Sequence, residues 1–178
     1  MSGSAASPGH LARRFFGALW PGGPGASDEA WVRQWLLPGE VALWTRLSGP
    51  DRRHAVGVAR RTAARRGGEE AAGRAVLAAA LLHDVGKLAA RLGTGRRVLA
   101  TVAGRGTDRE QALVWSNAGG LRRRVGLYLR HGELGADMLA LAGSDPLTVT
   151  WAREHHLPAD QWTLDADVAL ALAAADDD

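Results

Sequence analysis

The apolar residues of this chain recur mainly three or four positions apart, the spacing that gives an α-helix one apolar face. No stretch of useful length alternates between apolar and polar residues as a half-buried strand does. The pattern therefore predicts an all-α fold. We expect helices over residues 28–36, 40–47, 51–66, 69–82, 108–115, 121–131, 133–143, 148–156 and 165–175.

Helix-ending and helix-starting residues separate these segments. Ser27 is the expected N-cap of the first helix, because Asp28 and Glu29 follow it as first-turn acids. Residues 38–39 (Pro-Gly) and 48–50 (Ser-Gly-Pro) end the first two helices. The helix over 69–82 is expected to run without a break, and segment 97–103 (RVLATVA) is compatible with either helix or strand.

Composition divides the chain into a tail and one domain. Residues 1–27 are rich in Gly, Ser, Pro and Ala, which predicts a flexible tail with a short amphipathic island at 15–20. Residues 28–178 are long enough to bury one hydrophobic core. Within that domain, residues 93–126 form an expected insertion, either a lid over a site or an additional helical hairpin.

The residue types that are absent limit the chemistry and the location. The chain has no cysteine, which excludes disulfides and thiolate sites. No apolar run approaches the roughly 18 residues of a membrane span. Segment 10–20 lacks the apolar centre of a secretory signal. We therefore expect a cytoplasmic protein.

Charge is unevenly distributed along the chain. Residues 1–130 carry 21 basic and 9 acidic side chains, a net charge of +12, whereas residues 131–178 carry 1 and 10, a net charge of −9. Such asymmetry can indicate an anionic ligand for the basic part. The alternative is that the two parts fold together and neutralise each other.

The most informative polar residues are His83 and Asp84, which end the apolar, alanine-rich run at 75–82. A buried carboxylate is costly unless it is paired or binds a metal. Imidazole nitrogen and carboxylate oxygen are suitable ligands for a divalent transition metal. Four further histidines of the predicted domain and an acidic C-terminus extend the pattern. In chain order the series is His54, His83, Asp84, His131, His155, His156 and Asp176.

This series over residues 51–178 resembles the HD superfamily of metal-dependent phosphohydrolases. It is most similar to the two-metal members, such as cyclic-dinucleotide phosphodiesterases and HD-type diadenosine tetraphosphate hydrolases. The resemblance implies a helical bundle with a metal site in its core. It implies that Asp84 bridges two metals and that all seven residues of the series are metal ligands. Asp177 is an alternative to Asp176, with Asp165 or Asp167 as an outside alternative, and one residue of the 155–156 doublet can instead be a supporting partner.

The resemblance also implies an activity. It indicates hydrolysis of a phosphate ester or anhydride of a nucleotide or small phosphorylated metabolite, with one or two ions of Fe, Mn, Co, Ni or Zn. Asp84 and Lys87 are the expected catalytic residues, and Lys87, Arg52 and Arg53 are candidates to contact substrate phosphate. The alternative is an HD module that binds metal or nucleotide without turnover. Nucleic-acid binding through the arginines of segment 52–66 is a weaker alternative, because no stacking aromatic residues are interleaved there.

Overall fold

The computed structural model describes residues 22–90, 92 and 107–177, and every regular element in these ranges is helical, which confirms the all-α prediction. The amphipathic island at 15–20, segment 97–103 and most of the predicted tail lie outside the described residues. No described helix combines the length and apolarity needed to cross a membrane. The elements are α2 (Ala26–Trp35), α3 (Pro38–Trp44), α4 (Gly49–Arg65), α5 (Glu69–Ala72), α6 (Arg74–Leu82), α7 (Lys87–Ala90), α9 (Arg109–Ser116), α10 (Gly120–Leu129), α11 (His131–Leu141), α12 (Pro146–Glu154), η1 (Ala159–Gln161) and α13 (Ala166–Asp177).

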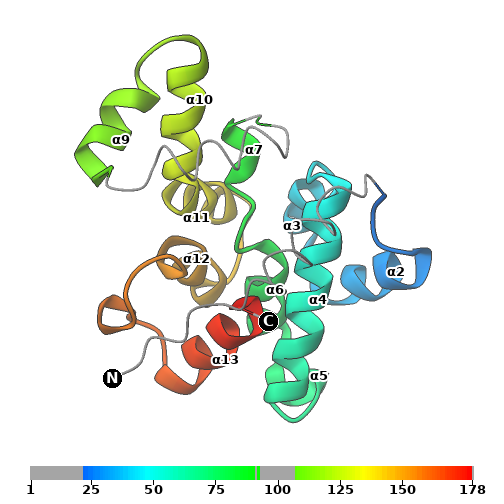
Figure 1. Cartoon of the computed structure of the whole chain (residues 1–178). Coiled ribbons are helices and arrows are strands. Elements are labelled where there is room, and N and C mark those ends of the chain that lie inside the picture. The colour runs from blue at the N-terminus through cyan, green and yellow to red at the C-terminus, as the bar shows by residue number, and fades with distance from the viewer. Residues whose placement is uncertain (1–21, 91, 93–106, 178) are drawn as a thin grey trace, which may run out of the picture.

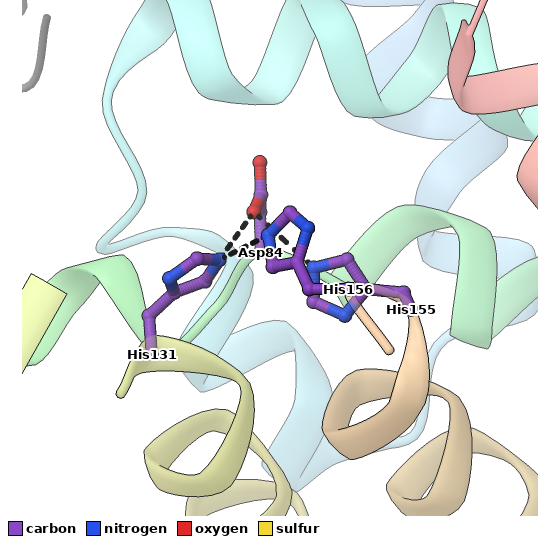
Figure 2. Close-up of side chains that lie close together, drawn as sticks. All are labelled: Asp84, His131, His155 and His156. Atoms are coloured by element: carbon purple, nitrogen blue, oxygen red, sulfur yellow. Dashed lines mark hydrogen bonds and ion pairs between the residues drawn. The ribbon is translucent and has the colours of Figure 1, made fainter. Parts of the chain in front are cut away.

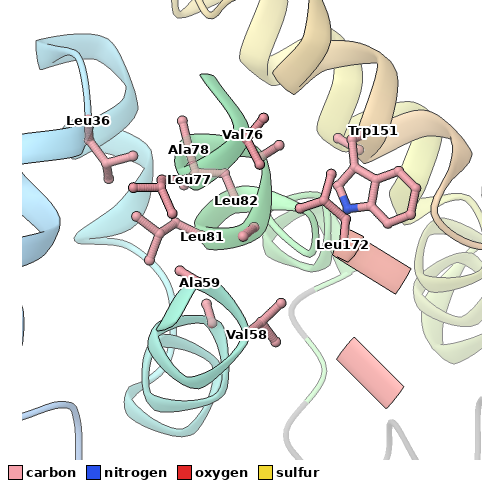
Figure 3. Close-up of a cluster of buried hydrophobic side chains, with 14 of the residues drawn as sticks. Leu36, Val58, Ala59, Val76, Leu77, Ala78, Leu81, Leu82, Trp151 and Leu172 are labelled. Atoms are coloured by element: carbon pink, nitrogen blue, oxygen red, sulfur yellow. The ribbon is translucent and has the colours of Figure 1, made fainter. Parts of the chain in front are cut away.

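Helix α6 lies at the centre of the bundle (Figure 1). Its sequence, RAVLAAALL, is apolar on every face after Arg74, and a helix of that kind is stable only when other elements surround it. From Leu77 to Leu82 no side chain is more than 1 % exposed. Figure 3 shows Leu36, the C-cap residue of α2, and side chains of α4, α12 and α13 packed around it, including Trp151 and Leu172. The apolar core therefore holds the C-terminal end of α6 in a fixed position.

The prediction of one continuous helix over 69–82 is wrong, because Gly73 divides it. Gly73 has φ +77°, a left-handed conformation that glycine adopts readily and other residues rarely do. The short α5 ends there, and the separate helix α6 starts at Arg74 and is buried in the core from Val76 onward. The predicted Ser27 cap is also wrong, since α2 starts at Ala26 with Gly25 as N-cap and no side-chain cap bond.

The described part of the expected insertion is a helical hairpin. Helices α9 and α10 pack against each other and protrude from one end of the molecule (Figure 1). Asp108 caps α9 as the sequence predicts, since its carboxylate accepts a hydrogen bond from the Gln111 amide at 2.7 Å. Helix α10 also contacts α7 and α11, so the hairpin is joined to the elements on either side of it.

Candidate metal centre

His83 and Asp84, the HD pair, lie at the C-terminal end of α6, where the apolar helix is followed by a turn over residues 83–86, the HD turn. His83 is the C-cap residue of α6 and is 2 % exposed, and Asp84 follows it at 9 %. Packing of α6 in the core therefore fixes both side chains. The two carboxylate oxygens of Asp84 face different sets of neighbours.

The first group of candidate ligands surrounds Oδ1 of Asp84. This oxygen lies 3.3 Å from Nε2 of His131 and 3.8 Å from Nε2 of His155. His156 joins them, because its Nε2 lies 2.8 Å from Nε2 of His131. One donor atom from each of these four residues lies within 4.8 Å of the others (Figure 2). His131 starts α11 and the doublet directly follows α12, so two helix ends meet the HD turn here.

The second group lies on the other side of Asp84. His54 and His83 join Asp84 in a set whose donor atoms are also within 4.8 Å of one another. Oδ2 of Asp84 is 3.5 Å from Nε2 of His83. Asp176, near the end of α13, adds an oxygen 2.8 Å from Nε2 of His54 and 3.7 Å from Nε2 of His83. Asp84 is therefore common to both groups.

Three of the histidine rings are held by backbone carbonyls of their own chain segments. Nδ1 of His83 bonds to Ala80 O at 2.9 Å, and Nδ1 of His155 bonds to Ala152 O at the same distance. Nδ1 of His131 bonds to Tyr128 O at 2.6 Å. Because a carbonyl only accepts, Nδ1 must donate in each case. In a neutral ring this arrangement leaves the lone pair on Nε2, the atom that faces Asp84.

The residues present fit a transition-metal site. Nε2 of His83 and Nε2 of His155 are buried and have no hydrogen-bond partner. A buried polar atom without a partner costs about 1–3 kcal/mol, a cost that a bound cation would remove. The donor set of imidazole nitrogens and carboxylate oxygens suits Zn, Fe, Mn, Co or Ni. The described side chains are thus close enough, and of the right chemistry, to hold a metal ion.

The electrostatic environment of the centre favours the protonated form of His83 and the ionised forms of Asp84 and Asp176. Burial acts to lower the pKa of His83, but the carboxylates of Asp84 and Asp176 outweigh it and raise this pKa to about 9. Burial opposes ionisation of Asp84, yet Lys87 and His83 hold its pKa well below the usual range. The pKa of Asp176 is likewise lowered despite burial, through the hydrogen bond from His54 and the charge of His83. Without a metal, a protonated His83 is therefore the cation that the two carboxylates enclose.

The pKa values of His155 and His156 are lowered, whereas that of His83 is raised. Burial, helped by the nearby His83 and His131, lowers the pKa of His155 and outweighs Asp84, which acts to raise it. Desolvation of its ring within the cluster, together with His155 and His131, lowers the pKa of His156 to about 3, although the residue as a whole is exposed. Both rings are consequently neutral at neutral pH, which is the form that binds metals.

These shifts predict that metal binding releases a proton from His83. A cation and a proton compete for Nε2, so below pH 9 a bound metal displaces about one proton from this ring and affinity rises with pH. Calorimetric titration of Mn²⁺ at pH 7.5, in buffers with different ionisation enthalpies, measures that number. We expect the number of protons released by His83 to decrease from about one as the pH approaches 9. Release that stays constant over this pH range contradicts the assignment.

The candidate phosphate ligands occupy different surroundings. Lys87 starts α7, and its ammonium pairs with Oδ2 of Asp84. Arg52 lies on α4, where its guanidinium pairs with Glu29 at 2.7 Å. Arg53 is half-buried on the same helix. Of the three, Lys87 is the one shown beside the candidate ligands.

Among the described acids near the C-terminus, Asp176 is the one with contacts to the candidate ligands. Asp167 and Asp177 are exposed. Asp165 is engaged at the start of α13, where its carboxylate accepts from the amides of Asp167 and Val168 at 3.1 and 3.2 Å.

No protein-family model matches the chain, and comparisons with curated proteins and with solved structures found no match either.

Sequence reasoning missed Glu154, which braces the segment that carries the doublet. Its carboxylate accepts from the amide and the hydroxyl of Thr163 at 2.8 and 2.7 Å. The indole of Trp162 donates to the carbonyls of Glu154 and Leu157, at 3.1 and 3.0 Å. The only signal in the sequence was an acidic residue directly before two histidines, and its partners lie beyond the next turn.

Proposed function

We propose that this protein is an HD-type metal-dependent phosphohydrolase. Its substrate would be a phosphate ester or anhydride of a nucleotide or small phosphorylated metabolite. The observation that carries the proposal is that Asp84 belongs to both groups of candidate ligands. One carboxylate with an oxygen toward each group can serve two cations at once, as the resemblance in the ligand series implies.

The ligand assignment follows the two groups. His54, His83 and Asp176 would hold one cation, and His131, His155 and His156 the other, with Asp84 between them. A pair of divalent cations supplies Lewis acidity, which activates water and neutralises negative charge on a phosphoryl group. The carbonyl-bound Nδ1 atoms keep three rings in place during this chemistry, so the ligands need little rearrangement.

Lys87 is the residue we assign to the phosphate. Burial acts to lower the pKa of its ammonium, but Asp84 outweighs burial and raises that pKa, so the side chain stays charged at neutral pH. A fixed positive charge beside the candidate ligands can neutralise a phosphoryl oxygen. Phosphoryl transfer depends largely on such positioning and charge stabilisation. The proposal therefore requires no further nucleophile or base from the protein.

The test combines metal analysis with a substrate panel. Purified protein is analysed for bound metal and assayed with Mn²⁺, Fe²⁺ or Co²⁺ on phosphomonoesters, nucleotides and dinucleotides. We expect bound metal, turnover of at least one compound, and loss of both in the His83→Ala/Asp84→Ala variant. Metal and nucleotide binding without product would instead indicate the non-catalytic HD module. Absence of both metal and turnover would remove the hydrolase proposal.

A further inference from the structure

A hollow of about 500 Å³ lies between α7 and α10, apart from the candidate ligands. Its described lining consists of Ala89, Ala90, Gly120, Arg123, Arg124 and Leu127. Four of these residues are small or apolar, and the other two carry guanidinium groups. The hollow thus combines space for a ligand with two donors that recognise phosphate oxygens through paired hydrogen bonds.

The positive charge around this hollow has no neutralising partner among the described residues that line it. Neither α7 (KLAA) nor α10 (GLRRRVGLYL) contains an acidic residue. Among the described residues, no ion pair is found for Arg123 or Arg124, and both are exposed. Arg122 differs, since its guanidinium lies 5.8 Å from the ring of Trp115. Two adjacent arginines therefore remain available to an anion.

The position of these arginines is unfavourable for the helix itself. They lie near the N-terminal end of α10, where the helix dipole is positive and acidic residues are preferred. A bound anion at this end would interact favourably with both the arginines and the dipole. Stability of α10 alone thus does not account for the charge placed here.

The two helices that form the hollow also lead to the candidate metal centre. Helix α7 begins at Lys87, which pairs with Asp84, and continues to Ala89 and Ala90 at the hollow. Helix α10 passes from Arg123 and Arg124 toward His131, which follows it by two residues. At 1.5 Å per residue, Arg124 is about 8 Å along the axis from the end of α10. Both helices therefore connect the hollow with residues of the candidate metal centre.

We propose that this hollow binds phosphate groups of the substrate other than the one that is hydrolysed. The inference rests on the proposed function, which it deepens: the substrate carries a chain of at least three linked phosphates. Arg123 and Arg124 hold the distal phosphates while the reacting phosphate lies at the metal centre. They act as binding residues and take no part in the chemical step.

The experiment compares two inorganic probes, orthophosphate and tripolyphosphate, by calorimetric titration of the metal-loaded protein. Protein-bound metal is measured before and after each titration, because tripolyphosphate also chelates metals. We expect tripolyphosphate to bind at least tenfold more tightly than orthophosphate. The Arg123→Gln/Arg124→Gln variant should reduce that preference to about threefold or less, since each lost charge-assisted contact weakens binding by about tenfold. Its affinity for orthophosphate should change less than twofold.

The matched control is Arg33→Gln/Arg46→Gln, which removes the same charge from two exposed arginines that do not line the hollow. It should leave the preference within twofold of the parent. An equal loss in both variants, or an unchanged preference in Arg123→Gln/Arg124→Gln, overturns the proposal. The assay for turnover is read separately. If the preference for tripolyphosphate depends on Arg123 and Arg124 but no substrate is hydrolysed, the anion site is supported and the hydrolase proposal is contradicted. If a substrate is hydrolysed but no such preference is found, the hydrolase proposal is supported and the anion site is contradicted.

Discussion

Replacing Asp84 with asparagine should remove metal from both ligand groups, whereas replacing His54 or His156 with alanine should remove one ion only. Asp84 is common to the two groups, while His54 and His156 each belong to one. Asparagine keeps the size of the side chain but removes the negative charge that two cations would share. Changing even a supporting partner of a metal ligand weakens affinity by about 10- to 100-fold, so loss of the shared ligand should exceed 100-fold at each position.

Metal content per chain after dialysis against limiting Mn²⁺ or Zn²⁺ checks this prediction. We expect two ions in the parent, about one in His54→Ala and in His156→Ala, and none in Asp84→Asn. Asp137→Asn is the matched control, because Asp137 has a side chain that is 72 % exposed and lies apart from the ligand groups. Circular dichroism establishes that each variant remains helical. Retention of two ions by folded Asp84→Asn would show that Asp84 does not link the groups.

Much of the helical fold could be predicted from the sequence, because helices depend on local patterns of apolar and polar residues. The apolar run at 75–82 is hydrophobic on all faces, and the structure buries it at the centre. The gathering of distant residues is different in kind. His54 and Asp176 are 122 positions apart in the sequence, yet Nε2 of His54 lies 2.8 Å from Oδ1 of Asp176. No spacing rule predicts that distance, and the expectation that they meet came only from the resemblance of the ordered ligand series to a known family.

Features that depend on backbone geometry were not predicted. Gly73 lies within a run of helix-forming residues, so the sequence alone favours a continuous helix where the structure has a break. The carbonyl bonds that hold His83, His131 and His155 arise because each ring lies at a helix end, three residues after the carbonyl it contacts. That spacing is visible in the sequence only after the helix boundaries are known to within one residue.

Gly86 lies between the HD pair and Lys87, and replacing it should lower both the stability of the protein and its metal content. A Cβ atom at Gly86 would lie 1.8 Å from His131 O and 2.6 Å from the amide nitrogen of Gly135. Both neighbours are backbone atoms of α11, so neither can rotate away as a flexible side chain would. Gly86 does not have a positive φ, and space is therefore the reason that glycine is required. The HD turn and the start of α11 approach closely because neither side has a side chain at the contact.

Gly86→Ala should therefore separate α11 from the HD turn and move His131 away from Asp84. We expect a loss of about 3 kcal/mol in the free energy of unfolding, at the upper end of the usual cost of overpacking. The ion held by the His131 group should be lost first, while the His54 and His83 group keeps its contacts. Urea unfolding and metal content measure the two effects. Gly119→Ala is the control, because a Cβ there meets no atom within 4 Å. Gly119 is the N-cap residue of α10, where alanine is less favourable than glycine, so this change should cost no more than about 1 kcal/mol. If Gly86→Ala is as stable as Gly119→Ala and binds as much metal, the close approach of α11 is not what positions His131.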